Sequence, residues 1–316
     1  MWKGVSVVGG GVWGRALAQV LAFKQEVLLY SLSEVNVKLE NPNVRISCDI
    51  ESLKGSKYLF LVVPSSAMRA ACDSIKSIVD ASSCSVIICS KGIEIETGLL
   101  MSEVVSEFFP TKNITILSGP NFAAEIADGL PAITSIVAEN LSFAKELAKE
   151  FSTTNFKFIP ATNVVMAQLF GAVKNVLAIL CGVVRGMELG ENLAAALVTV
   201  GVKDIMQLSR HKNKSAGGDL FLEPAGIGDM FLTCSSVTSR NNKFGVDLVS
   251  RYYGKNYQEI FSLENITVEG VSTILALKKW HISLPLMDFA HNLIQAKYRN
   301  KEEITRELQN IILEHE

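Results

Sequence analysis

The sequence predicts an α/β protein with a doubly wound parallel sheet of the Rossmann type, followed by an all-helical domain. Short apolar runs alternate with helical patterns in the first half, as in a parallel sheet flanked by helices. A glycine-rich turn follows the first of these runs. After Phe158 long helical patterns take over. We therefore place the boundary near Pro160 and predict a dinucleotide-binding domain at residues 1–160 and a helical, substrate-binding and catalytic domain at residues 161–316.

Five runs in the first half are predicted to be strands. Each is apolar throughout rather than alternating, which is typical of parallel strands buried on both faces. The predicted strands are GVSVVG (4–9), EVLLYS (26–31), YLFLVVP (58–64), SVIICS (85–90) and NITILSG (113–119). The predicted helices between them are RALAQVLAF (15–23), SAMRAACDSIKSIV (66–79), LLMSEVVSEFF (99–109) and NFAAEIADG (121–129).

The glycines after the first strand have the spacing of a dinucleotide-binding turn. Gly9, Gly11 and Gly14 form G-x-G-x-x-G between a predicted strand and a predicted helix. In this motif the first glycine permits a tight turn, the second lets a pyrophosphate approach the backbone, and the third permits close helix packing. Amides at the helix N-terminus then hold the phosphate charge. An ordinary glycine turn is the alternative.

The end of the second strand leaves the choice of cofactor open. An acid there would contact the adenosine ribose, and an arginine nearby would accept a 2′-phosphate. This chain has Ser31, Leu32 and Ser33, with Glu34 slightly later. NAD and NADP therefore both remain compatible with the sequence.

Long helical patterns fill the second half, and one of them contains a lysine on an apolar surface. These patterns are NVVMAQLFGAVKNVLAILCGVV (163–184), ENLAAALVTVGVKDIMQLSR (191–210), EGVSTILALKKW (269–280), MDFAHNLIQAKY (287–298) and KEEITRELQNIILEH (301–315). Helical neighbours of Lys174 are Phe170, Gly171, Leu177 and Ala178. An ammonium on such a surface must reach water, meet an anion or lose its proton.

Composition favours an enzyme of the cytoplasm. The net charge is −2, from 30 basic and 32 acidic residues, so no broad basic face for nucleic acid is expected. The apolar runs fall short of the roughly 18 residues of a membrane span. The start, MWKGVSVVGGGVWG, imitates a signal peptide, but its glycines favour the strand and turn. The six cysteines form no C-x-x-C pair, which indicates reduced thiols and no metal site.

Six ordered motifs carry a resemblance to a known family: GGGVWGRALA, SKGIEIETG, SGPNFAAEIADGLP, GAVKNVLAI, PAGIGDMFLTC and SRNNKFG. From residue 5 to about residue 290 the chain resembles the bacterial type of NAD(P)-dependent glycerol-3-phosphate dehydrogenase. The resemblance implies a Rossmann domain with a helical C-terminal domain and NAD(P)H as the cofactor. It also implies reduction of dihydroxyacetone phosphate to sn-glycerol 3-phosphate for phospholipid synthesis.

The resemblance assigns roles to residues on both sides of the boundary. Lys174 matches the acid–base residue at the substrate carbonyl, and Asp229 and Thr233 lie beside it. Lys91 matches a residue that touches both substrate and cofactor and that joins Lys174 and Asp229 in catalysis. The implied substrate contacts are Lys91, Gly119, Asn121, Lys174, Asp229, Thr233, Arg240 and Asn241. The implied cofactor contacts are Gly9, Gly11, Val12, Trp13, Gly14, Lys91, Ala123, Ser239, Arg240 and Glu269.

The residues themselves support part of this assignment. Asp229 and Thr233 are four apart, so a helix that begins after Gly228 places both on one face. A guanidinium such as that of Arg240 suits phosphate oxygens better than a point charge does. The structural alternatives are a snorkelling Lys174, a helix-capping Asp229, a surface Arg240 and a solvated Lys91.

The sequence leaves other functions open, and it departs from the family pattern at some positions. A related Rossmann-plus-helical dehydrogenase for a β-hydroxyacid or keto acid would also use a lysine, and a non-catalytic NAD(P)H sensor would need no lysine and acid together. Leu32 stands where the family often has arginine or histidine, Val200 stands where arginine is common, and residues 36–47 form a shortened connection. Apolar helices such as ENLAAALVTV (191–200) are suited to a homodimer interface.

Overall fold

The computed structural model describes residues 4–35, 39–110, 112, 114–213, 218–264 and 266–313. The chain divides into two compact units. The first consists of residues 1–91, 99–168 and 218–228, and the second of residues 92–98, 169–217 and 229–316. The first unit thus runs past the predicted boundary at residue 160 and takes in a later segment, while residues 92–98 belong to the second.

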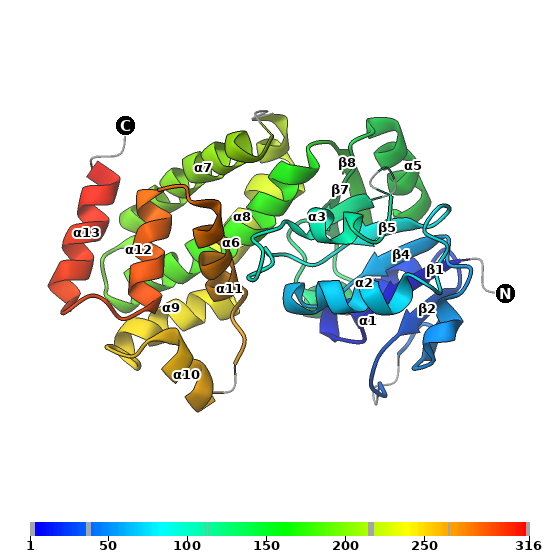
Figure 1. The fold of residues 1–316 in the computed structure, drawn as a ribbon, viewed down its shortest axis with the longest axis horizontal. Helices are drawn as coiled ribbons and strands as arrows, with labels where there is room; N and C mark the ends of the chain where they lie inside the picture. Colours follow the sequence, from blue (N-terminus) through cyan, green and yellow to red (C-terminus); the bar gives the residue numbers. More distant parts are fainter. Residues whose placement is uncertain are drawn as a thin grey trace. The chain divides into compact units, whose positions relative to one another are not determined.

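The first unit contains a sheet of eight strands in the order β3-β2-β1-β4-β5-β6-β7-β8 (Figure 1). All neighbours pair in parallel except β6 and β7, which are antiparallel. The strands are β1 (Val5–Val8), β2 (Val27–Tyr30), β3 (Val44–Ser47), β4 (Tyr58–Leu61), β5 (Ser85–Ile88), β6 (Ile114–Ser118), β7 (Ala132–Val137) and β8 (Phe156–Ala161). The predicted doubly wound sheet and its five strands are confirmed, and β3, β7 and β8 are additional.

Helices of the first unit cover the sheet. They are α1 (Val12–Leu21), α2 (Met68–Ile75), α3 (Met101–Ser106), α4 (Ala123–Ala127) and α5 (Leu141–Phe151). One core cluster joins α1, α4 and α5 to the same face of the strands, through Leu17, Ile126 and Phe151 against Val7 and Phe60. The four predicted helices are confirmed, and α5 is additional.

The strand order reverses between β1 and β4. Because these two strands are parallel neighbours, their carboxyl ends share one edge of the sheet, which is where such sheets bind ligands.

The second unit is helical, as predicted (Figure 1). Its helices are α6 (Val164–Gly186, which begins in the first unit), α7 (Glu191–Asn213), α8 (Asp229–Ser235), α9 (Arg240–Ser250), α10 (Tyr257–Glu264), α11 (Glu269–Leu277), α12 (Pro285–Ile294) and α13 (Lys301–Leu313). The last predicted helix extends to His315, which lies outside the described residues. By length and composition α6 passes the test for a membrane span, but 94% of its most apolar window is buried inside the protein. We therefore assign α6 as a core helix.

Asp204 on α7 is a buried acid whose burial has a measurable consequence. Its side chain is 1% exposed, and its Oδ2 atom has no hydrogen-bond partner among the described residues. Burial, with a smaller effect from Asp288, raises the pKa of Asp204 to about 7. Asp288 itself pairs with Lys278 at 2.7 Å. Asp204 is therefore neutral in the folded protein at pH values where the unfolded chain has already released that proton.

We predict that Asp204 makes the protein less stable as the pH rises from about 4 to about 7, because the folded state binds the extra proton in this window. Replacing Asp204 with asparagine removes this pH-dependent contribution to the free energy of unfolding. At pH 8 the Asp204→Asn variant should be more stable than the wild type, and the difference should shrink toward pH 5. Thermal unfolding between pH 5 and pH 8 measures this, with Glu302→Gln, an exposed acid of the same unit, as the control. A difference that stays constant with pH would contradict the prediction.

Candidate active site

The glycine turn of the first unit has the geometry that its sequence predicts. Gly9 has φ +122°, and a Cβ atom there would lie 2.2 Å from the Val62 carbonyl oxygen. A Cβ atom at Gly14 would lie 1.9 Å from the Gly9 carbonyl oxygen, so both positions exclude a side chain. Gly11 is different: it is the N-cap of α1, and no atom lies within 4 Å of a Cβ built there. Open space beside helix N-terminal amides suits a dinucleotide phosphate.

Other predicted cofactor residues of the first unit differ in exposure. Val12 is 63% exposed at the start of α1, whereas Trp13 packs against the core cluster beneath it. Ala123, the first residue of α4, packs against the same cluster. Leu32, just after β2, is 90% exposed. Val12 and Leu32 therefore present apolar surface to the solvent near the carboxyl end of the sheet, while Trp13 and Ala123 also have a packing role.

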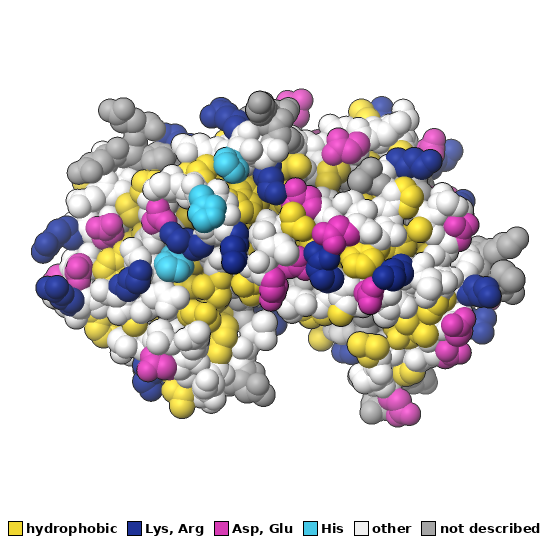
Figure 2. All heavy atoms as spheres, in the orientation of Figure 1, with side chains coloured by type: hydrophobic (Ala, Val, Ile, Leu, Met, Phe, Trp, Pro, Cys, Tyr) yellow, Lys and Arg dark blue, Asp and Glu magenta, His cyan; other side chains and the backbone are white. Residues whose placement is uncertain are grey.

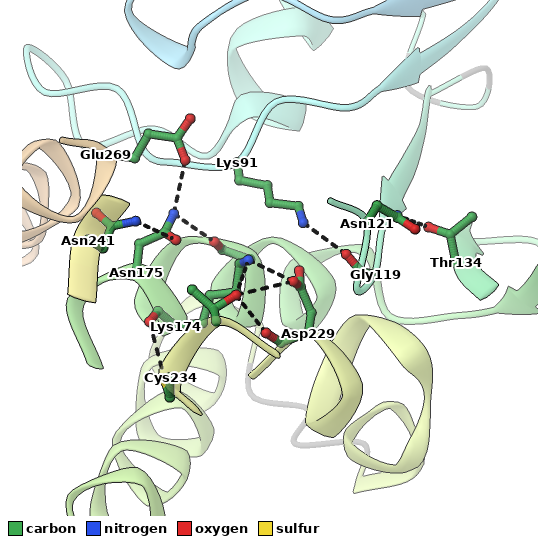
Figure 3. Close-up of polar contacts among 12 residues, drawn as sticks. Lys91, Gly119, Asn121, Thr134, Lys174, Asn175, Asp229, Cys234, Asn241 and Glu269 are labelled. Carbon is green, nitrogen blue, oxygen red and sulfur yellow. Dashed lines mark hydrogen bonds and ion pairs between the residues drawn. The ribbon is translucent and has the colours of Figure 1, made fainter. Parts of the chain in front are cut away.

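Lys91 follows β5 and reaches the segment that follows β6. Its Nζ atom donates to the Gly119 carbonyl oxygen at 3.1 Å (Figure 3). Gly119 has no room for a side chain, since a Cβ atom there would lie 2.8 Å from the Thr134 Cα atom. Asn121 donates from Nδ2 to Thr134 Oγ1 at 2.9 Å, while its Oδ1 atom has no partner among the described residues. The structure thus brings Lys91 to Gly119 and leaves an acceptor of Asn121 unused.

In the second unit the structure brings Lys174, Asp229 and Thr233 together. The Lys174 Nζ atom donates to Asp229 Oδ1 and to Thr233 Oγ1, each at 2.7 Å (Figure 3). The three residues are 6%, 1% and 5% exposed, respectively. Lys174 therefore does not snorkel to water: it meets an anion in the protein interior. Such a pair is costly to desolvate and needs the additional hydrogen bonds that Thr233 supplies.

Helix α8 fixes the two partners of this lysine. It begins at Asp229, directly after Gly228, so the predicted helix start is confirmed. Asp229 and Thr233 lie one turn apart, and the Thr233 hydroxyl donates to the Asp229 carbonyl oxygen at 2.7 Å. The Thr233 hydroxyl proton is thereby directed at the backbone, and the lone pairs of the Thr233 oxygen accept from the Lys174 ammonium. In addition, the Cys234 thiol donates to the Lys174 carbonyl oxygen at 3.8 Å, which joins α8 to α6.

A second polar network lies beside the lysine, around Asn175, which the sequence did not indicate as a site residue. Asn175 donates from Nδ2 to Glu269 Oε2 at 3.1 Å and accepts from Asn241 Nδ2 at 3.0 Å. Asn241 in turn accepts from the Gly270 amide at 3.0 Å. Asn175 is 3% exposed. The available signal was a polar side chain in an otherwise apolar helix, next to Lys174. The network links two predicted site residues, Asn241 and Glu269.

The predicted phosphate-binding end lies at the start of α9. Ser239 is the N-cap of this helix, and its side chain accepts from the Asn242 amide at 3.4 Å. Arg240 is exposed, and its side chain makes no hydrogen bond or ion pair with the part of the chain that the structure describes. A cation in the first turn is unfavourably placed relative to the helix dipole unless an anion lies nearby. Arg240 is therefore available for an anionic ligand.

On the face drawn in Figure 2, basic and acidic side chains are interspersed rather than gathered into one area. The chain also has a net charge of −2. That face therefore shows no concentration of basic side chains of the kind that polyanion binding needs.

Comparisons with known proteins match both parts of the chain. The model for the N-terminus of NAD-dependent glycerol-3-phosphate dehydrogenase matches residues 4–144, and the model for its C-terminus matches residues 163–305. A glycerol-3-phosphate dehydrogenase (NAD(P)+) of Wolbachia pipientis wMel is 32% identical over 310 residues, covering 92% of this chain and 95% of the relative. The enzyme of the same name from Zymomonas mobilis is 33% identical and covers 94% of this chain and 90% of the relative.

Solved structures agree with these matches. The crystal structure of glycerol-3-phosphate dehydrogenase from Coxiella burnetii has a TM-score of 0.83 and 27% identity, with 98% of each chain covered. A glycerol-3-phosphate dehydrogenase structure from Plasmodium falciparum has a TM-score of 0.85 at 20% identity, covering 96% of this chain and 94% of that one. The second comparison shows a shared fold.

Proposed function

Since this chain belongs to the family of NAD-dependent glycerol-3-phosphate dehydrogenases, we propose that it reduces dihydroxyacetone phosphate to sn-glycerol 3-phosphate with NAD(P)H. The observation that carries the proposal is the buried contact of Lys174 with Asp229 and Thr233. Structural packing alone rarely retains a charge in such a place. The product would supply the glycerol phosphate of phospholipids.

Lys174 serves as the general acid. When bound, the dihydronicotinamide ring supplies a hydride to the substrate carbonyl carbon, which leaves negative charge on the carbonyl oxygen. The Lys174 ammonium stabilises this charge and donates a proton from Nζ to the oxygen, which becomes the new hydroxyl. In the reverse direction the neutral amine accepts the same proton. Asp229 holds the ammonium in place at 2.7 Å and Thr233 fixes its direction.

The other substrate roles follow from the chemistry of the available groups. Arg240 and Asn241 bind the substrate phosphate, since a guanidinium fork and an amide both donate to phosphate oxygens. Lys91 contributes charge to catalysis and to binding of substrate and cofactor. Gly119 and Asn121 contact the substrate, and the unused Asn121 Oδ1 atom accepts from one of its hydroxyls.

The cofactor is held mainly by the glycine turn. Gly9 and Gly14 shape the turn, Gly11 leaves space that a pyrophosphate would occupy, and the exposed Val12 and the neighbouring Trp13 would contact the dinucleotide when it is bound. Ala123, Ser239, Arg240 and Glu269 complete the proposed cofactor contacts, together with Lys91. The choice between NADH and NADPH is left open by this set.

The direct test is the loss of nicotinamide absorbance when the purified protein meets dihydroxyacetone phosphate, with NADH and NADPH in parallel. Dihydroxyacetone and an unphosphorylated keto acid serve as comparison substrates. Turnover of the phosphorylated ketone well above that of the other two supports the proposal. Turnover of the keto acid alone would favour the related β-hydroxyacid or keto-acid dehydrogenase. Binding of NAD(P)H without turnover of any of them would indicate a sensor.

Arg240→Gln should weaken recognition of the substrate phosphate. We expect KM for dihydroxyacetone phosphate to rise about 10- to 100-fold, the value of a charge-assisted contact, with a smaller change in kcat. At saturating NAD(P)H, which offsets any weaker contact of the variant with the cofactor, activity on dihydroxyacetone should change little, because that substrate has no phosphate. Arg306→Gln, an exposed arginine of the same unit, is the matched control. An unchanged KM in Arg240→Gln would remove Arg240 from the phosphate site.

We also propose a cytoplasmic location and a homodimer. All six cysteines are free thiols, five of them buried, which suits a reducing compartment. Helix α7, with its apolar start at residues 191–200, is the proposed element of the dimer interface. Light scattering of the purified protein tests the oligomeric state, and a monomeric mass at micromolar concentration would contradict it.

A further inference from the structure

Arg15 is a cation in the first turn of α1 that the proposed function does not use. It directly follows Gly14, the last glycine of the turn. Its Nη1 atom donates to the Gly10 carbonyl oxygen at 2.8 Å, so the guanidinium lies on the glycine turn itself. This is its one side-chain hydrogen bond within the described residues, which also offer it no ion pair. Most of the five guanidinium donors are thus left for another partner.

The position of this arginine is electrostatically unfavourable in the protein alone. The first turn of α1 carries no acidic residue, and the N-terminus of a helix is the positive end of its dipole. A partly buried guanidinium there adds positive charge to positive charge. A phosphate anion bound there would make the overall electrostatic environment of the Arg15 guanidinium favourable. A basic residue in the first turn of a helix is locally unfavourable, and such unfavourable placements are expected at functional sites.

The position of Arg15 suits two phosphate groups of a dinucleotide, namely the pyrophosphate and, in NADP, the 2′-phosphate. The Gly10 carbonyl belongs to the turn that is proposed to hold the pyrophosphate. Gly10 also stands against the end of β2, since a Cβ atom there would lie 2.4 Å from Ser31 Oγ. This strand end is where the 2′-phosphate of NADP lies in folds of this type. Both groups share one chemistry, that of a phosphate anion.

We infer that Arg15 is a cofactor-binding residue whose guanidinium pairs with a phosphate of the dinucleotide while Nη1 stays on the Gly10 carbonyl oxygen. The inference rests on the proposed dinucleotide site at this turn. It adds a cationic residue to that site, and this residue favours a negatively charged group of the cofactor. Because Arg15 lies on the glycine turn and has no part in the proposed proton transfer, it acts on cofactor affinity and not on the chemical step.

The test measures binding by calorimetry with NADH, NADPH and adenosine for wild type, Arg15→Gln and Arg45→Gln. Arg45 is an exposed arginine on β3 of the same unit and serves as the control. We expect Arg15→Gln to raise Kd about 10-fold or more for at least one dinucleotide, with little change in kcat at saturating cofactor. A loss for both NADH and NADPH assigns Arg15 to the pyrophosphate. A loss for NADPH alone assigns it to the 2′-phosphate.

Adenosine separates a phosphate contact from damage to the turn, because adenosine carries no phosphate. Its affinity should be the same in wild type and Arg15→Gln. An equal loss for adenosine and the dinucleotides would mean that Arg15 only supports the turn, and this would overturn the inference. Unchanged affinity for all three ligands would also overturn it, and the proposed function would stand if dihydroxyacetone phosphate were still reduced.

Discussion

Replacing Lys174 with methionine is expected to reduce kcat for dihydroxyacetone phosphate about 1000-fold. The substitution preserves side-chain length but removes the only group of the buried cluster that can both donate a proton and carry positive charge. General acid catalysis accounts for factors of about 100 to 10,000 in enzymes, and loss of charge stabilisation adds to this. Absorbance assays at saturating NADH and NADPH measure the effect.

Stability must be separated from chemistry in this experiment, because the single variant leaves the buried Asp229 carboxylate without the Lys174 ammonium. Breaking a buried ion pair in this way costs about 3 to 5 kcal/mol. The double variant Lys174→Met with Asp229→Asn removes both charges and should regain much of that stability. It should remain inactive while it still binds NAD(P)H. If the stabilised double variant retained wild-type turnover, the assigned role of Lys174 would be wrong.

The second large effect is expected at the crossing of α6 and α9. A Cβ atom at Gly182 would lie 2.0 Å from the Asn242 carbonyl oxygen, and one at Gly245 would lie 2.0 Å from the Ile179 carbonyl oxygen. Backbone therefore lies directly on backbone at this crossing. Gly182→Ala must push the helices apart, and we expect a loss of about 2 to 3 kcal/mol of the free energy of unfolding.

The same substitution should weaken substrate binding, because the crossing holds α9 where Asn241 donates to Asn175 at 3.0 Å. We expect KM for dihydroxyacetone phosphate to rise in the folded Gly182→Ala protein. Urea unfolding and steady-state kinetics measure the two effects. Gln309→Ala, on the exposed side of α13, is the helix control. Stability within about 0.5 kcal/mol of wild type would show that the crossing can relax at little cost.

The sequence predicted the elements whose residues carry a strong local pattern. β1, β2, β4, β5 and β6 are almost continuously apolar, and α6 and α7 are long. β3 escaped prediction because its short run, VRIS, is partly exposed along its whole length. β7 and β8 follow the six parallel strands β1 to β6 with mixed composition, and only their pairing with each other and with β6 defines them.

The sequence by itself determined the type of sheet, the glycine turn, the helix that begins after Gly228, and a lysine on an apolar helix surface. These are local properties, set by periodicity, by positions that exclude a Cβ atom and by the cost of an apolar surface around a charge. Only the tertiary structure decided which anion Lys174 meets, since Asp229 is 55 residues away in the chain. It alone linked Asn175 to Asn241 and Glu269, and it alone placed Arg15 on the Gly10 carbonyl. Hydrogen bonds depend on distance and direction in space, and spacing along a chain specifies neither beyond the next turn of a helix.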